Sequence, residues 1–307
     1  MMTKVIVFGI ACVLPFFFIG IINRTKARWA GRKGPSVFQL YYDFSRLLRK
    51  GEVISKTTSF VFIVTPSLNV AAALFALLFI PIPFIGSMIS FPCDFIAFTY
   101  ALGLAKFMLV LAALDTGSSF EGMGASREVT FSTLVEMAFF IVLGTLALLT
   151  NQISFEAIFA TITVSAGYSL LVKILLVASL FIMLLAEGSR VPIDDPNTHL
   201  ELTMIHEVMI LDYSGPDLAF MVYAASMKIM LIALLIANLC IPPNLPSIAA
   251  LCLFIGILLF IYISIGAVES LIARSRMSHV PQFIFVMTAL SLTAFAVVAF
   301  FLLGGLS

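Results

Sequence analysis

Eight long apolar segments restrict the structures open to this chain. Each has at least 18 residues, and an α-helix rising 1.5 Å per residue crosses a hydrocarbon core of about 30 Å with about 20 apolar residues. The chain is therefore expected to be an all-α integral membrane protein of about eight transmembrane helices, forming a single transmembrane domain over residues 1–307. The expected spans are 5–22, 60–80, 95–114, 129–150, 168–187, 218–240, 246–267 and 282–304.

The composition excludes several other classes of protein. Only 11% of the residues are charged and 62% are hydrophobic, whereas soluble domains carry about 25% charged residues. A net charge of +1 provides no general basic surface for nucleic acid. The four cysteines form no C-x-x-C pair, and His206-Glu207 lacks the second histidine of an H-E-x-x-H zinc motif. No metal site is expected in this chain.

Basic residues occur in alternate connections between the expected spans. The first connection holds nine Lys or Arg residues, and the third, fifth and seventh hold Arg127, Arg190 and the pair Arg274 and Arg276. The second, fourth and sixth hold none. The positive-inside rule then places the basic connections in the cytoplasm and both termini outside, in a multi-pass protein of the inner (cytoplasmic) membrane.

Two of the basic connections have features beyond charge. Residues 35–50 place apolar and aromatic side chains at helical spacing, which predicts an amphipathic helix lying in the membrane interface, either as a simple anchor or as one wall of a lateral cavity. Residues 115–128 combine three glycines with Asp115, Glu121, Arg127 and Glu128. Because a solvated linker needs neither so many glycines nor so many charges, we expect a docking loop here.

The fifth connection, residues 187–217, carries seven acidic residues against one arginine. Acids beside apolar residues at membrane depth are desolvated, which raises their pKa toward neutrality and suits them to proton exchange. A proton path is one interpretation of this segment, and a soluble docking loop that meets basic partner residues is the other. The path would use Glu187, Asp194, Glu201, Glu207 and Asp212.

Charged residues also occur inside the expected spans, where ionisable groups usually indicate a function. Lys173 and Glu269 lie near enough to span ends to extend toward the interface. Lys106, Glu136 and Lys228 lie deeper. We expect at least one buried lysine–carboxylate pair among these groups and Glu187, and we add Glu136 and Lys228 to the candidate proton path.

These segments together resemble one family over essentially the whole chain. The matching motifs are Arg32-Lys33-Gly34-Pro35, Leu114-Asp115-Thr116-Gly117-Ser118, Gly124-Ala125-Ser126-Arg127-Glu128, Glu187 with Pro192-Ile193-Asp194, Glu201, and Tyr213-Ser214-Gly215. The chain resembles subunit 1 of respiratory complex I and subunit 4 of formate hydrogenlyase, the membrane subunits of complex I and of membrane-bound nickel–iron hydrogenases. The D-T-G-S and G-A-S-R-E stretches, with Glu269 ahead of Ala273-Arg274-x-Arg276, are closer to the hydrogenase branch.

The resemblance implies a non-catalytic membrane anchor and proton-translocating coupling subunit of an oxidoreductase complex. It implies no cofactor in this chain, with iron–sulfur clusters, and in some complexes a nickel–iron site, in the partner subunits. The implied partners are hydrogenase-like large and small subunits, an iron–sulfur subunit and antiporter-like membrane subunits. The implied docking residues are Arg32, Gly34, Pro35, Asp115, Glu121, Arg127, Glu128 and Arg190.

The sequence departs from the family where relatives carry an E-x-E-x-E pattern, because this chain has Asn197, His199 and Glu201 there. This leaves open whether the parent complex makes hydrogen, reduces a quinone or uses another acceptor. A stand-alone secondary ion transporter is the alternative from another class, although the chain shows none of the internal repeats common in transporters.

Overall fold

The computed structural model describes residues 2–162, 167–194, 204–242, 245–273 and 275–304, and this part of the chain is helical without a β-strand. Eight helices are long and apolar enough to cross a membrane, which confirms the expected fold class. They are α1 (Met2–Trp29), α3 (Phe60–Leu77), α4 (Asp94–Asp115), α5 (Ser119–Thr150), α7 (Gly167–Glu187), α9 (Gly215–Cys240), α10 (Ser247–Leu271) and α11 (Val280–Gly304). The shorter elements are α2 (Gln39–Leu47), α6 (Phe155–Thr161), α8 (His206–Met209) and the 3₁₀ turn η1 (Met277–His279).

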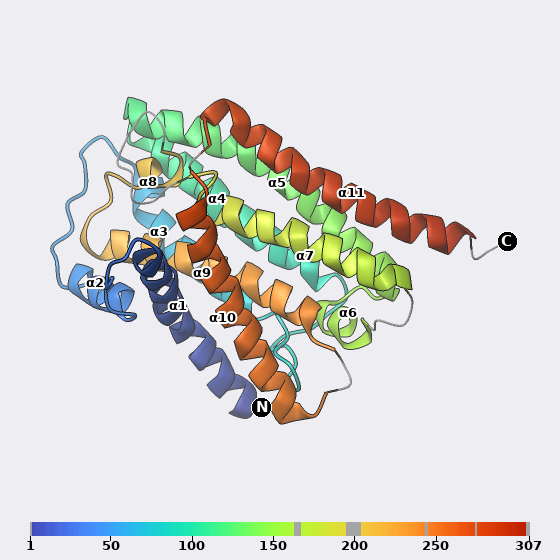
Figure 1. Ribbon diagram of the computed structural model, residues 1–307. Coiled ribbons are helices and arrows are strands. Elements are labelled where there is room, and N and C mark those ends of the chain that lie inside the picture. The colour runs from blue at the N-terminus through green and yellow to red at the C-terminus, as the bar shows by residue number, and fades with distance from the viewer. Residues whose placement is uncertain (1, 163–166, 195–203, 243–244, 274, 305–307) are drawn as a thin grey trace.

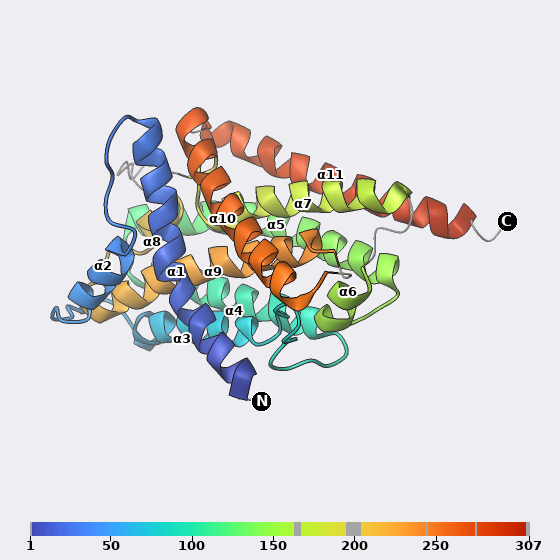
Figure 2. The ribbon, with the colours of Figure 1, turned by 60° about the horizontal axis from the view of Figure 1, so that its bottom comes forward.

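Helix α9 forms the centre of the bundle and is the most buried of the eight spans. It packs against α1, α3, α7 and α10, while α5 and α11 lie against each other on the side of α7 (Figure 1). Helices α1 and α10 form a second pair, and α3 and α4 a third, seen from another side in Figure 2. The other helices therefore pack around α9, and several different helices can carry ionisable groups into the interior.

The two ends of the bundle differ in composition. One end, which we call the charged end, holds the links from α1 to α3, α4 to α5, α7 to α9 and α10 to α11. The other, which we call the proline-rich end, holds the links from α3 to α4, α5 to α7 and α9 to α10, including Pro81, Pro83, Pro92 and Pro242. The cytoplasmic location of the charged end stays a prediction.

The third connection is shorter than expected. Helix α5 begins at Ser119, so residues 119–128, which we assigned to a docking loop, form its first turns instead. The apolar pattern begins only at residue 129, and it therefore misses the polar start of the helix. Gly124 serves close packing rather than a turn, because a Cβ atom there would overlap the Val208 side chain and lie 3.0 Å from the Ile205 carbonyl oxygen of the α8 region.

The amphipathic helix is present in the first connection, over Gln39–Leu47 rather than 35–50. Its Phe44 ring packs edge-on against Phe16 of α1 and lies near Tyr223 of α9, while Tyr41 and Tyr42 are exposed. The Tyr213-Ser214-Gly215 motif fixes the far end of this connection. The Ser214 hydroxyl accepts from the Val53 N–H at 2.9 Å and donates to the Val53 carbonyl at 3.2 Å.

Candidate functional site

A cluster of five charged side chains lies toward the charged end of the bundle; four of them are largely buried, and Glu136 is the most exposed member. Lys106 of α4 is the hub, since its Nζ lies 2.5 Å from Glu187 Oε1, 3.8 Å from Glu136 Oε1 and 3.9 Å from Glu128 Oε1. Lys228 Nζ of α9 lies 3.6 Å from the second oxygen of Glu187. The expected lysine–carboxylate pairing is therefore present, and Glu187 is shared by both lysines.

The depth of this cluster follows from the helices that carry it. Lys228 is 13 residues from the start of α9 and 12 from its end, so it lies near the middle of a helix about 39 Å long. Lys106 is nine residues, or about 14 Å, from the last residue of α4. Glu187 is the last residue of α7, and it lies at the same depth as the two lysines because both of them contact it. Charges at such depth are costly unless they are paired, which accounts for the close contacts.

Asp194 connects the cluster to the acidic connection between α7 and α9. Its Oδ2 accepts hydrogen bonds from the backbone N–H groups of Ile205 at 3.1 Å and His206 at 3.2 Å, and its side chain is buried. A cavity of about 20 Å³ is lined by Glu128, Glu187 and Asp194 together with apolar side chains and two serines. A cavity of this volume has room for one water molecule beside the three carboxylates.

His206 of α8 lies buried beside this cluster. Burial, together with the nearby positive charge of Lys228, lowers the pKa of its imidazole to about 3, against a weaker opposing effect of Glu187. The imidazole is therefore neutral at pH 7. Its Nε2 atom has no hydrogen-bond partner within the described part of the chain. A neutral, buried imidazole beside this cluster is sensitive to the charges of its neighbours.

A second ionic group joins α1, α10 and the segment after α7. Glu269 has a fully buried side chain and lies 2.8 Å from Lys26 Nζ and 3.3 Å from Arg190 Nη1. Glu269 therefore does not extend to the interface as we expected. Arg190, which we assigned to a docking surface, is buried in this chain and bound to Glu269, so that assignment is corrected. Spacing along the sequence gave no indication of this contact, because the three residues are far apart in the chain.

The remaining path candidates are dispersed. The Glu136 side chain is 42% exposed and touches the cluster only through Lys106. Glu207 is half-buried, and Asp212 is exposed with its backbone N–H donating to Glu121 Oε1 at 3.2 Å. Glu201 lies outside the described residues and stays a prediction. Asp212 is therefore set apart from the buried cluster, whereas Glu187 belongs to it and Asp194 adjoins it.

The expected docking residues also divide into groups. Glu128 belongs to the buried cluster and Glu121 is buried beneath the 204–214 segment, so neither presents its carboxylate at the surface. Arg127 Nη1 donates to the Met204 carbonyl at 2.9 Å, and Asp115 Oδ2 accepts from the Ser59 N–H at 2.6 Å. The three residues of the first connection are exposed: Arg32, Gly34 and Pro35.

Tyr213 was not among the candidates but holds the acidic connection to α3. Its hydroxyl donates to the Phe62 carbonyl at 3.0 Å, its ring stacks on that of Phe62, and burial raises the pKa of its phenol. Most of the described part of the acidic connection is thus packed into the bundle rather than solvated. The interpretation of this segment as a soluble loop does not fit the packing of Val191, Ile193, Met204, Ile205, Val208, Met209 and Ile210.

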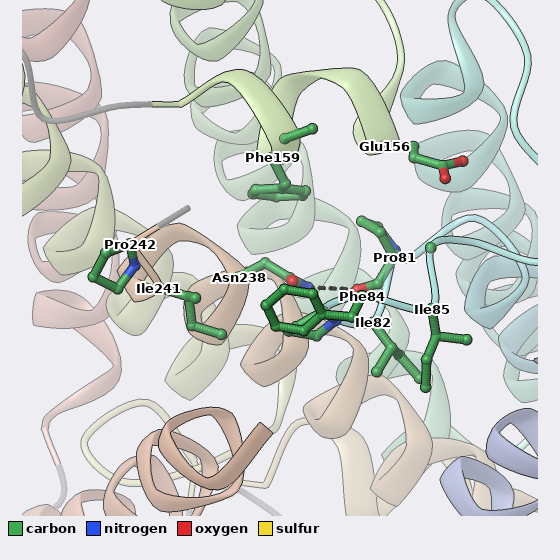
Figure 3. Close-up of a pocket in the computed structure, with 12 residues that line it drawn as sticks. Pro81, Ile82, Phe84, Ile85, Glu156, Phe159, Asn238, Ile241 and Pro242 are labelled. Carbon is green, nitrogen blue, oxygen red and sulfur yellow. Dashed lines mark hydrogen bonds between the residues drawn. The ribbon is translucent and has the colours of Figure 1, made fainter. Parts of the chain in front are cut away.

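A separate pocket of about 400 Å³ lies at the proline-rich end (Figure 3). Its lining is mainly apolar, and Asn238 Nδ2 donates to the Pro81 carbonyl at 2.8 Å on its floor. Glu156 stands at the rim, with its carboxylate turned away from Asn238 (Figure 3). This pocket contributes no group to the buried cluster.

The chemistry available in the described residues is proton exchange between carboxylates and lysines. Within these residues no group of three or more His, Cys, Asp or Glu side chains is placed to hold a metal ion. Asp194, Glu128 and Glu187 supply carboxylate acceptors, and Lys106 and Lys228 supply ammonium donors. Such an arrangement transfers protons only if the charge of one member changes the proton affinity of the next.

Known proteins are similar to this chain in sequence and in fold. A family model described as NADH dehydrogenase matches residues 2–299. Hydrogenase-4 component C of Escherichia coli (strain K12) is 29% identical over 274 residues, covering 87% of this chain and 86% of the relative. Formate hydrogenlyase subunit 4 of the same organism is 29% identical over 224 residues, covering 73% and 72%.

A solved structure has the same fold. It belongs to the membrane-bound sulfane sulfur reductase, an archaeal respiratory membrane complex, and one of its chains matches with a TM-score of 0.80. The match covers 95% of this chain and 98% of that chain, at 20% sequence identity.

Proposed function

The chain belongs to the NADH dehydrogenase family, and from this we propose that it is the membrane anchor and proton-translocating coupling subunit of a multisubunit redox complex. Family membership confirms the resemblance that the motifs indicated. The chain is a membrane subunit, and the coupling role is the step that we add.

The observation that carries the proposal is the shared carboxylate of Glu187. It lies between Lys106 at 2.5 Å and Lys228 at 3.6 Å, and it lines the same small cavity as Asp194. A proton that reaches Asp194 changes the field at Glu187, and a change at Glu187 alters the balance between the two lysines. This supports the transmission of a charge change from the acidic connection to the centre of the bundle.

The proposed partners follow from the relatives, which are named as components of hydrogenase-4 and formate hydrogenlyase. We infer that hydrogenase-like large and small subunits and an iron–sulfur subunit dock on the charged end, in the cytoplasm, and that antiporter-like subunits adjoin the bundle in the membrane. The iron–sulfur clusters then belong to those partners. The electron acceptor is set by them and not by this chain.

Docking at the charged end would depend on the segment that Arg127 supports. The guanidinium of Arg127 holds the Met204 carbonyl at 2.9 Å, next to the start of α8. An arginine that bonds a backbone carbonyl in this way is not replaced by a smaller side chain. We therefore expect Arg127→Ala to displace the 204–209 segment and weaken attachment of the peripheral subunits.

The proposal is tested by isolating the chain from its native membrane in mild detergent through an affinity tag. We expect iron–sulfur absorbance to co-purify with the wild-type chain and to be reduced severalfold with Arg127→Ala. Ser126→Ala, at an exposed position on the same helix, is the matched control and should retain the partners. A wild-type chain that never co-purifies with an iron–sulfur protein would contradict the proposed function, whereas full retention by Arg127→Ala would contradict only the docking role of this residue.

A further inference from the structure

An apolar groove opens on the side of the bundle toward the proline-rich end. Helices α7 and α10 both pack on α9 but hardly on each other, and they diverge toward this end with α9 between them (Figure 1). The groove has a volume of about 590 Å³ and is lined by Ile174, Val177 and Phe181 of α7, Leu239 of α9, and Phe260 and Ile261 of α10. Two of its lining side chains, Ile174 and Phe260, are exposed in this chain.

One buried cation, Lys173, lies in this groove. Its residue is only 7% exposed, yet no carboxylate of the described residues lies within 4.0 Å of its Nζ. Its ammonium donates to the Ile162 carbonyl at 3.3 Å. Residues 163–166 and 243–244, which are not described, contain no Asp or Glu. Lys106 and Lys228, by contrast, each lie beside a carboxylate. An unneutralised ammonium in an apolar setting favours an anionic ligand.

The length of the groove indicates which ligand fits. Along α7 the lining runs from Leu170 to Phe181, which is 11 residues or about 17 Å. This is little more than one leaflet of a hydrocarbon core of about 30 Å. A transmembrane helix of another subunit needs a contact surface across the full core, whereas a lipid acyl chain needs one leaflet. Lys173 lies six residues from the start of α7, near the end of the bundle where headgroups are found.

We propose that this groove binds one anionic phospholipid, with an acyl chain along α7, α9 and α10 and its phosphate on Lys173. The site is distinct from the buried ionic cluster and does not depend on the proposed coupling function. Its occupancy would fill the gap between α7 and α10.

The test uses the full chain in lipid bilayers and a tryptophan placed in the groove. Trp29 is the single tryptophan of the chain and lies at the opposite end, so Trp29→Phe with Ile174→Trp gives one reporter at a position 57% exposed in the groove. Phosphatidylglycerol and phosphatidylcholine with brominated acyl chains are added in separate series. We expect the anionic lipid to quench at about fivefold lower mole fraction than the zwitterionic one, as expected for one basic residue acting on an anionic headgroup.

In the same background, Lys173→Gln should reduce this ratio to about one while quenching by phosphatidylcholine is unchanged, which also shows that the groove is intact. Lys4→Gln, at the same end of the bundle but outside the groove, should retain the fivefold preference. A ratio near one with Lys173 present, or a preference that survives Lys173→Gln, would overturn the proposal. The absence of quenching by either lipid would also overturn it, because a protein surface would then occupy the groove. Relief of quenching by an added uncharged quinone would overturn it too, because a quinone would then be the occupant.

Discussion

Replacement of Lys106 by methionine is the sharpest test of the buried cluster. The side chains are similar in length, so the substitution removes the charge with little change in volume. In the wild-type protein Lys106 lies within 4 Å of Glu187, Glu136 and Glu128. After the substitution, among the described residues, Glu187 retains only Lys228 at 3.6 Å, and Glu128 loses the one cation that lies within 4 Å of it.

Leaving a buried charge without its partner costs about 3–5 kcal/mol. We therefore expect Lys106→Met to lower the free energy of unfolding in detergent by that amount. Lys228→Met removes only one contact, at 3.6 Å, and should cost about 2 kcal/mol. Unfolding is measured by denaturant titration followed by circular dichroism, with the wild-type chain alongside.

The double variant Lys106→Met with Glu187→Gln distinguishes a direct interaction from general damage. If the two residues interact as their 2.5 Å contact indicates, the double variant costs at least about 1.5 kcal/mol less than the sum of the single variants. Additivity within about 0.5 kcal/mol would refute the reasoning, because it would mean that the two side chains do not interact in the folded protein.

Other predictions concern the surroundings of the cluster. Glu269→Gln should lower the free energy of unfolding by about 3 kcal/mol because it leaves Lys26 and Arg190 without their buried carboxylate. Asp43→Asn, at the exposed Asp43–Arg46 pair, should lower it by less than about 1 kcal/mol. Equal effects of the two substitutions would contradict the burial argument. The imidazole of His206 has its pKa lowered to about 3 in the folded state, so the unfolded state binds the additional proton below pH 6.5. Stability should therefore fall with decreasing pH by about 1.4 kcal/mol per unit between pH 6.5 and 3, and His206→Phe but not His279→Gln should remove this slope in titrations at pH 7 and 5. Gly124→Ala should destabilise the protein by about 1–3 kcal/mol because the added Cβ overlaps Val208. Gly122→Ala has no atom within 4 Å of the added Cβ and should be neutral or stabilising by up to about 1 kcal/mol in the same titration. The reverse order would exclude close packing as the role of Gly124.

The spans were predictable because hydrocarbon thickness sets a minimum apolar length, and all eight are present. Helix ends were not predictable where a helix continues beyond the apolar region. Helix α5 begins ten residues before the apolar pattern at residue 129, and for this reason Glu128 was assigned to a surface loop although it faces Lys106.

Contacts between distant segments could not be read from spacing. The sequence identified Lys106, Lys228 and Glu187 as costly charges that need partners, but only the packing of α4, α7 and α9 decides which charges pair. The contact of Glu269 with Arg190 joins residues 79 positions apart and left no periodic signal. Asp194 was recognised as an acid in an apolar setting, whereas its bonds to the Ile205 and His206 backbone depend on a fold of the connection that no motif encodes.

We propose that charge changes at the acidic connection reach the middle of the membrane through Glu187. The direct measurement is the number of protons translocated per electron by the assembled complex in sealed vesicles, with redox turnover recorded in the same sample. For Glu187→Gln we predict that turnover continues while the ratio falls at least tenfold, and that Glu156→Gln at the proline-rich end retains the wild-type ratio. A wild-type ratio in the Glu187→Gln complex would contradict the account.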